Sequence, residues 1–149
     1  MADTIADRIV TAIVTRLQTI SVANGYTTEA GANVFTDRQG LDSEAVTYPA
    51  ILVFDLEEES EELVNRRQRN RMTLQIVGFA KDVDVRPLIG DIKASVFDAT
   101  DTTLSGLAHH LGYAGYTIER PEDGSRFDRA DISLWCEYDE NYGDPYTLT

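Results

Sequence analysis

The sequence predicts an α+β fold in which a mainly antiparallel sheet of two hairpins packs against two principal helices. Apolar residues recur every three or four positions within 5–20 and within 88–97, as they do in amphipathic helices. Apolar runs at 50–56, 72–80, 116–119 and 130–138 are typical of strands. With 149 residues, 42% of them hydrophobic and 26% charged, the chain fits a single globular domain over 1–149.

The first predicted helix carries a stripe of large aliphatic side chains. Its members are Ile5, Ile9, Ile13, Leu17 and Ile20. We expect Asp3 or Thr4 to cap its amino end, because short polar side chains accept hydrogen bonds from the free backbone amides there. Asn24-Gly25 tolerates left-handed backbone angles and is expected to stop the helix. Residues 33–36 then predict a short strand, and Asp37-Arg38-Gln39-Gly40 a loop.

The first predicted hairpin joins a strand from Ala50 to Leu56, entered through Tyr48-Pro49, to an alternating strand from Met72 to Ala80. Between them the chain is first acidic, Glu57-Glu58-Glu59-Ser60-Glu61-Glu62, and then basic, Arg66-Arg67-Gln68-Arg69-Asn70-Arg71. If the chain folds back near Val64, opposite charges pair across the strands on one face. The predicted pairs are Glu61 with Arg67, Glu59 with Arg69 and Glu57 with Arg71.

The apolar side chains of this hairpin predict the same register. The opposite face would stack Leu56 on Met72, Phe54 on Leu74 and Leu52 on Ile76. Agreement between the charged and the apolar register is expected of a specified hairpin. A shift by one pairing step would keep every side chain on the same face.

A second helix is predicted to follow Asp82 or Asp84, either of which can cap it, with Pro87 in its first turn. Its apolar stripe comprises Leu88, Ile89, Ile92, Val96 and Phe97, and it is expected to end near Ala99-Thr100. Residues 103–111 predict a further helical turn. A second hairpin is expected around Pro121-Glu122-Asp123-Gly124, and residues 139–149 predict an extended, polar and aromatic C-terminal tail.

The acidic composition argues against nucleic-acid binding. Thirteen Lys and Arg against 26 Asp and Glu give a net charge of −13, which repels a phosphate backbone and an anionic membrane surface. The amino terminus mixes acids and arginines with its apolar residues, so it predicts neither a signal peptide nor a membrane span. We therefore expect the chain to fold in a cytoplasm.

The residue patterns predict no catalytic, metal or cofactor site. His109 and His110 are neighbours and lack the i, i+4 spacing of helical zinc ligands, so we interpret them as a partly exposed helix end. Cys136 alternates with Ile132 and Leu134, which favours a small buried hydrophobe over a nucleophile. A single cysteine also excludes an internal disulfide. The acids are so numerous that no pair stands out as a catalytic dyad.

The arginines at 66, 67, 69 and 71 allow two interpretations. In the first, they form an intramolecular charged face with the glutamates of a projecting hairpin, where each exposed pair contributes about 0.2–1 kcal/mol. In the second, glutamates of one subunit meet arginines of the next and give the contact its orientation. The candidate subunit interface comprises Glu57, Glu59, Glu61, Arg67, Arg69 and Arg71.

The order of elements and several short motifs resemble the tail terminator proteins of lambda-like long-tailed bacteriophages. The similarity runs from the first helix through Val34-Phe35-Thr36-Asp37-Arg38, Tyr48-Pro49-Ala50, Ile51-Leu52-Val53-Phe54 and the acidic stretch after it. It continues through the strand 72–79, the Pro87 helix, Gly115-Tyr116 with Glu119-Arg120 and Asp123, Ala130-Asp131-Ile132-Ser133-Leu134, and Glu137-Tyr138. The arginine-rich return strand and the tail after Tyr138 depart from the family pattern.

The resemblance implies a virion structural protein and no enzyme. Terminators of this family form a ring, hexameric in the family, that caps the head-proximal end of the tail tube, ends tube polymerisation and provides the head-joining surface. The implied partners are further copies of the chain, the tail tube protein and the head-completion (stopper) protein, with no cofactor, metal or membrane. Assembly is implied in the host bacterial cytoplasm. DNA passes through the lumen without specific binding, which suits an acidic protein.

Three alternatives remain open at this point. A head-completion or neck adaptor protein of the head-tail connector would bind the portal instead of tube ends. A small hydrolase acting through surface carboxylates would lose its activity on substitution of one Asp or Glu. A nucleic-acid-binding regulator would be retained on DNA in a salt-dependent way.

Overall fold

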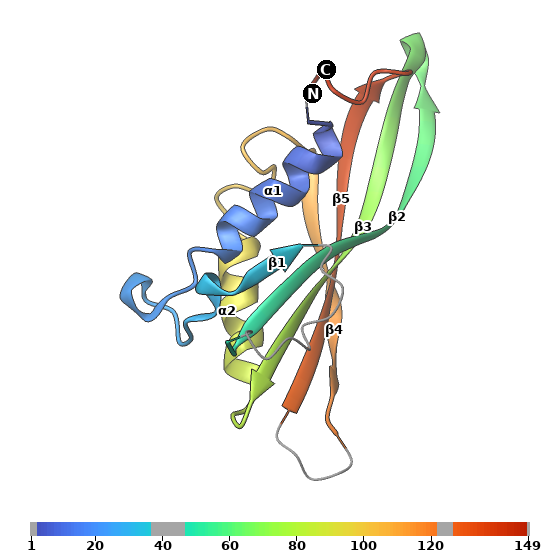
Figure 1. Ribbon diagram of the computed structural model, residues 1–149. Coiled ribbons are helices and arrows are strands. Elements are labelled where there is room, and N and C mark those ends of the chain that lie inside the picture. The colour runs from blue at the N-terminus through green and yellow to red at the C-terminus, as the bar shows by residue number, and fades with distance from the viewer. Residues whose placement is uncertain (1–2, 37–46, 122–126, 149) are drawn as a thin grey trace.

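Two helices cover one face of a five-stranded sheet in the computed structural model, which describes residues 3–36, 47–121 and 127–148 (Figure 1). The helices are α1 (Ile5–Leu17) and α2 (Arg86–Val96), and the strands are β1 (Val34–Thr36), β2 (Ala50–Leu63), β3 (Arg67–Lys81), β4 (His110–Glu119) and β5 (Phe127–Asn141). The predicted α+β class is confirmed. The loops predicted at 37–40 and 122–124 lie outside the described residues.

The strands form one mixed sheet in the order β1-β2-β3-β5-β4. β2 pairs antiparallel with β3, and β4 with β5. β3 and β5 pair antiparallel along the length of both, which merges these four strands into one surface. β1 adds a parallel pair with residues 51–53 at the start of β2.

Helix α1 begins where the sequence predicts, with Thr4 as its cap. The Thr4 hydroxyl accepts a hydrogen bond from the Asp7 amide at 3.0 Å, and the Asp7 carboxylate accepts one from the Thr4 amide at 3.1 Å. The helix ends at Leu17, although the predicted stripe runs to Ile20. Gln18 is its C-cap, and the Ile20 amide donates to the Leu17 carbonyl in a tighter turn. The Asn24 side chain donates to a carbonyl just past the helix at 2.8 Å, and Gly25, at φ 89°, closes a short 3-10 turn instead of the helix.

The apolar stripes of both helices meet the sheet in a single core. The helices contribute mainly isoleucine and leucine, and the strands contribute alternate aliphatic residues. The cluster includes Ile5, Ile9, Ile13, Leu17, Leu88, Ile92, Val53, Leu74, Ile76, Ile132 and Leu134. Each such side chain contributes about 1.5–3 kcal/mol by leaving water. This core anchors both helices to one face of the sheet.

Helix α2 is shorter than predicted at its carboxyl end. Its N-cap is Val85, and Asp84 accepts a hydrogen bond from the first helical amide at 3.0 Å. The helix ends at Val96 and not near 99–100. The reason is local: the Asp98 carboxylate accepts the Thr100 amide at 2.9 Å and holds a turn.

Residues 103–107 form turns, so the helical turn predicted for 103–111 is wrong. Leu104, Ser105 and Gly106 have φ angles of 50°, 59° and 89°, which a right-handed helix excludes. His110 already belongs to β4. The two histidines therefore lie at the start of a strand and not at the end of a helix.

A β-bulge between Asp55 and Glu57 divides β2 into two halves with different registers. Beyond the bulge, the pairs are Glu61 with Arg69 and Glu59 with Arg71, one pairing step from the predicted register. Before the bulge, Val53 opposes Ile76 and Leu52 opposes Val77, so the predicted stack of Leu52, Phe54 and Leu56 is wrong. The extra residue turns 51 and 53 inward and leaves Leu56 57% exposed.

The C-terminal residues do not form the extended tail predicted for 139–149. β5 continues to Asn141, which forms an isolated bridge with Asp144. The Pro145 carbonyl then accepts a hydrogen bond from the Ile5 amide at 2.8 Å. The segment after β5 therefore packs against the start of α1, and the two termini lie close together (Figure 1).

Candidate functional site

The far ends of β2 and β3 form an arm that rises past helix α1 (Figure 1). We define the arm as residues 57–71, which include the Val64–Arg66 turn between the two strands. Asn65 and Arg66 have φ angles of 62° and 58°, so the turn is tight. The Tyr142 amide donates to the Arg66 carbonyl at 2.7 Å. The end of β5 thus supports the turn, and the arm is a fixed part of the sheet.

All six residues of the predicted interface lie on one face of the arm. Directly opposed residues project to the same side of a sheet, and so do alternate residues of one strand. The register pairs Glu61 with Arg69, Glu59 with Arg71, Glu57 with Thr73 and Arg67 with Leu63. The same face continues onto β5, where Glu137 opposes Arg71 and Asp139 opposes Arg69. We call these residues of β2, β3 and β5 the charged face.

Among the described residues, the arginines of the charged face form ion pairs with β5 and not with the β2 glutamates as predicted. Arg67 Nη2 lies 3.0 Å and Arg69 Nε 2.9 Å from carboxylate oxygens of Asp139. Arg71 lies 3.9 Å from Glu137, and its guanidinium carbon is 4.2 Å from the centre of the Trp135 ring. The carboxylates on β5, a strand paired on both sides, are less hydrated than those on the β2 edge, which strengthens these pairs.

Asp139 is the centre of this cluster. Its side chain is 3% exposed, and His109 Nε2 lies 2.8 Å from it in addition to the two arginines. Burial by itself raises the pKa of Asp139, but the hydrogen bonds and charges of Arg69 and His109 outweigh burial and hold the pKa below its usual value. In return, the hydrogen bond and charge of Asp139 raise the pKa of Arg69. The cluster joins β3, β5 and the residue before β4.

The glutamates of β2 form an exposed acidic edge. Glu57, Glu59 and Glu61 are exposed, and none of them takes part in an ion pair within the described part of the chain. β1 pairs only with residues 51–53, so the described strands leave the outer side of the arm open. The arginines of the charged face are therefore held by β5, whereas the carboxylates at its edge stay exposed and form no ion pair in the described part of the chain.

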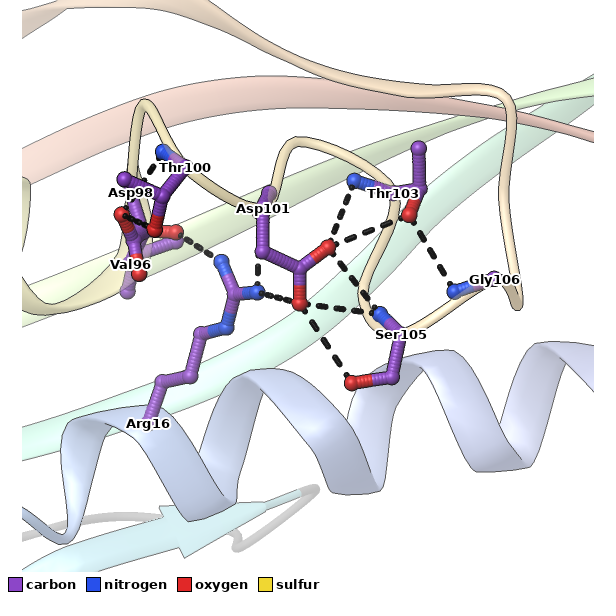
Figure 2. Close-up of polar contacts among 8 residues, drawn as sticks. All are labelled: Arg16, Val96, Asp98, Thr100, Asp101, Thr103, Ser105 and Gly106. Atoms are coloured by element: carbon purple, nitrogen blue, oxygen red, sulfur yellow. Dashed lines mark hydrogen bonds and ion pairs between the residues drawn. The ribbon is translucent and has the colours of Figure 1, made fainter.

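A second polar cluster joins the two helices around Arg16 (Figure 2). Arg16 Nη1 donates to the Val96 carbonyl at 2.7 Å, and Nη2 donates to the carbonyl and the carboxylate of Asp101, each at 2.9 Å. Hydrogen bonds from the amides of Ser105 and Thr103 lower the pKa of Asp101. The donors and acceptors drawn in Figure 2 are matched to one another, so we interpret this cluster as structural. The place of Arg16 on the polar side of α1 gives no sign of this role.

Cys136 is buried in the core, as predicted. Burial and, to a smaller extent, the charge of Glu137 raise the pKa of its thiol to about 12, so the reactive thiolate is scarce near neutral pH. The residues described include no group of three or more side chains placed to hold a metal ion. None of the described helices has the length and apolar character needed to cross a membrane.

Asp139 was not among the predicted interface residues, although a signal for it existed. The alternation of Ala130, Ile132, Leu134 and Cys136 extends to Tyr138, which places 137 and 139 on the opposite face. Extending the strand by a few residues would have exposed this pattern. Comparison of the chain with models of known protein families and with curated proteins gave no match.

Proposed function

We propose that this chain is a tail terminator of a long-tailed bacteriophage. It is a virion structural protein whose ring, of six subunits in the family it resembles, caps the head-proximal end of the tail tube. The ring ends tube polymerisation and offers a surface to the head-completion protein. It carries out no chemistry, and DNA passes through its lumen.

The observation that carries this proposal is the exposed acidic edge of a fixed arm, whose glutamates form no ion pair in the described part of the chain. A closed ring needs a heterologous contact, in which one patch of a subunit meets a different patch of its neighbour. An edge of one sign at the outer side of the charged face is suited to such a contact because it rejects a second acidic edge. The net charge of −13 also lets a ring release the DNA that it surrounds.

Ring formation is tested by light-scattering mass across a concentration series, with electron microscopy of the most concentrated fraction. We expect a six-subunit ring with a central hole, either free in solution or on purified tail-tube ends. A protein that stays monomeric in both settings would contradict the proposal. Binding to portal complexes and not to tube ends would instead identify a head-completion or neck adaptor.

Charge variants that test this contact are best made at the glutamates of the charged face, and not at its arginines. Because Arg69 holds the buried carboxylate of Asp139, its reversal would damage the fold and the contact together. Glu59→Gln and Glu61→Gln remove charge from exposed side chains that form no ion pair among the described residues, and they place no cation opposite Arg71 or Arg69. We expect the double variant to fold normally and to assemble more weakly. Unchanged assembly would contradict a role for this edge.

A further inference from the structure

We infer that the tip of the arm of one copy inserts into an acidic cleft of the next copy. The inference rests on the proposed ring and names the two surfaces that would close it. The cleft lies between helix α1 and the bulged part of β2. The tip is the Val64–Arg66 turn.

The cleft combines an apolar floor with an acidic rim. Its main part has a volume of about 520 Å³, and a hollow of about 270 Å³ adjoins it, with Ala6, Asp55 and Met72 common to both. Val10, Val53 and Met72 supply apolar surface. Six carboxylates line the two parts: Asp3, Asp7, Asp55, Glu57, Glu58 and Glu140. The described lining contains no Lys, Arg or His.

The tip of the arm has the complementary character. Val64 is 81% exposed, more than any other large hydrophobic side chain in the described part of the chain. Arg66 is exposed, and the described residues give it no ion pair, in contrast to Arg67, Arg69 and Arg71. An apolar side chain beside a cation without an ion pair fits an apolar floor with an acidic rim.

The tip cannot reach the apolar floor of the cleft in its own chain. Glu140 on the near rim opposes Gln68, two residues from Arg66, but Met72 on the floor is six residues from Arg66, about 20 Å away at 3.3 Å per residue. β3 is paired on both sides over these residues, so the arm does not fold back. The contact therefore joins two copies. It leaves one tip and one cleft free in every pair, which is the condition for a ring or a filament.

A pair of engineered cysteines tests the contact directly. Val64→Cys with Thr11→Cys places one thiol on the tip and one in the lining of the cleft. Cys136 is buried, so it does not compete under mild oxidation. We expect a ladder of disulfide-linked oligomers up to the ring. The matched control is Val64→Cys with Val83→Cys. Val83 is 57% exposed but lies outside the cleft, so this pair should give no ladder.

Charge variants test the same contact without cross-linking. Arg66→Glu should raise the concentration of half-assembly about tenfold or more, as for loss of a well-placed ion pair. Lys81→Glu makes the same charge change on an exposed side chain at the other end of β3 and should have little effect. Adding Asp55→Lys to Arg66→Glu should restore assembly. The urea midpoint of each variant shows whether it folds.

The outcomes separate the inference from the proposed function. Rings that form without the ladder, and that tolerate Arg66→Glu, would overturn the arm-to-cleft contact and leave the terminator proposal standing. A ladder from open filaments, with no closed ring on tube ends, would support the contact and overturn the ring. A protein that remains monomeric with and without tube ends would overturn both.

Discussion

Arg69 binds the carboxylate of Asp139 through two hydrogen bonds, from Nε at 2.9 Å and from Nη2 at 3.3 Å. This bidentate contact is geometrically specific and holds β3 to β5 at the base of the charged face. Arg67 and His109 complete the set of donors around the same carboxylate. The arginines that looked available for a neighbouring subunit are therefore first of all part of the fold.

Substitution of Asp139 by Asn should destabilise the chain. The change removes the negative charge that three donors share in a site where the side chain is 3% exposed. We expect the free energy of unfolding to fall by about 1–3 kcal/mol, the usual loss when a buried hydrogen-bonded group loses its partner. Urea unfolding followed by circular dichroism measures it. Glu62→Gln, on the exposed edge of β2, is the matched control and should leave the midpoint unchanged.

Acid should weaken the fold through four aspartates. The pKa values of Asp98, Asp101, Asp139 and Asp144 are lowered, mainly by hydrogen bonds to backbone amides or, for Asp139, by Arg69 and His109 against the effect of burial. A carboxyl whose pKa is lower in the folded state stabilises the fold above its unfolded pKa, and this contribution is lost as pH falls through the folded pKa. Stability should therefore decline below about pH 4.

The same pH series gives a sharper comparison. The difference in unfolding free energy between the wild type and Asp139→Asn should be full near neutral pH and shrink as Asp139 becomes protonated. A difference that stays constant down to pH 2 would contradict the lowered pKa of Asp139.

On the polar side of helix α1, substitution of Arg16 should lower the free energy of unfolding the most. Arg16→Gln removes the donors to the Val96 and Asp101 carbonyls and the ion pair with Asp101. We expect a loss of about 1–2 kcal/mol in unfolding free energy, because two carbonyls lose a charged donor. Arg86→Gln, which breaks a 3.7 Å pair at the surface, should change stability by less than about 0.5 kcal/mol. Equal effects would contradict the role of Arg16.

Helices and strands in which the apolar spacing repeats several times were predictable from the sequence. Local interruptions of that spacing, such as a bulge or a turn, were not. The stripe from Ile5 to Leu17 and the alternation from Ala130 to Tyr138 each decide between helix and strand because they repeat several times. The bulge at Leu56 adds one residue and leaves no mark in the composition, yet it exchanges the inward and outward positions of β2. Turns around Leu104 were predicted as helix because apolar spacing continues through them while Asp101 captures the amides that a helix would use.

The candidate site was predictable as a face but not as a set of ion pairs. Glu57, Glu59 and Glu61 share a face with Arg67, Arg69 and Arg71 in any register that differs by whole pairing steps, so the prediction survived the observed shift. The partners of the arginines depend on β5 lying beside β3, and Arg69 and Asp139 are 70 residues apart in the sequence. No local pattern determines which strand takes that place, and so Asp139 was missed.

Two glycines should respond to alanine in opposite directions. A Cβ atom on Gly31 would lie 2.5 Å from the Ile20 carbonyl oxygen and 2.6 Å from that of Gln18, both of them backbone atoms at the end of helix α1. The Gly31 amide also donates to Ile20 at 2.9 Å, so the backbone has little room to move. We expect Gly31→Ala to lower the free energy of unfolding by about 1–3 kcal/mol. Gly90 is exposed within helix α2 and would meet no atom within 4 Å, so Gly90→Ala should raise it by about 0.5–1 kcal/mol. Urea unfolding of both variants beside the wild type checks the pair, and a stabilising Gly31→Ala would mean that the loop before β1 does not pack against the end of α1 as described.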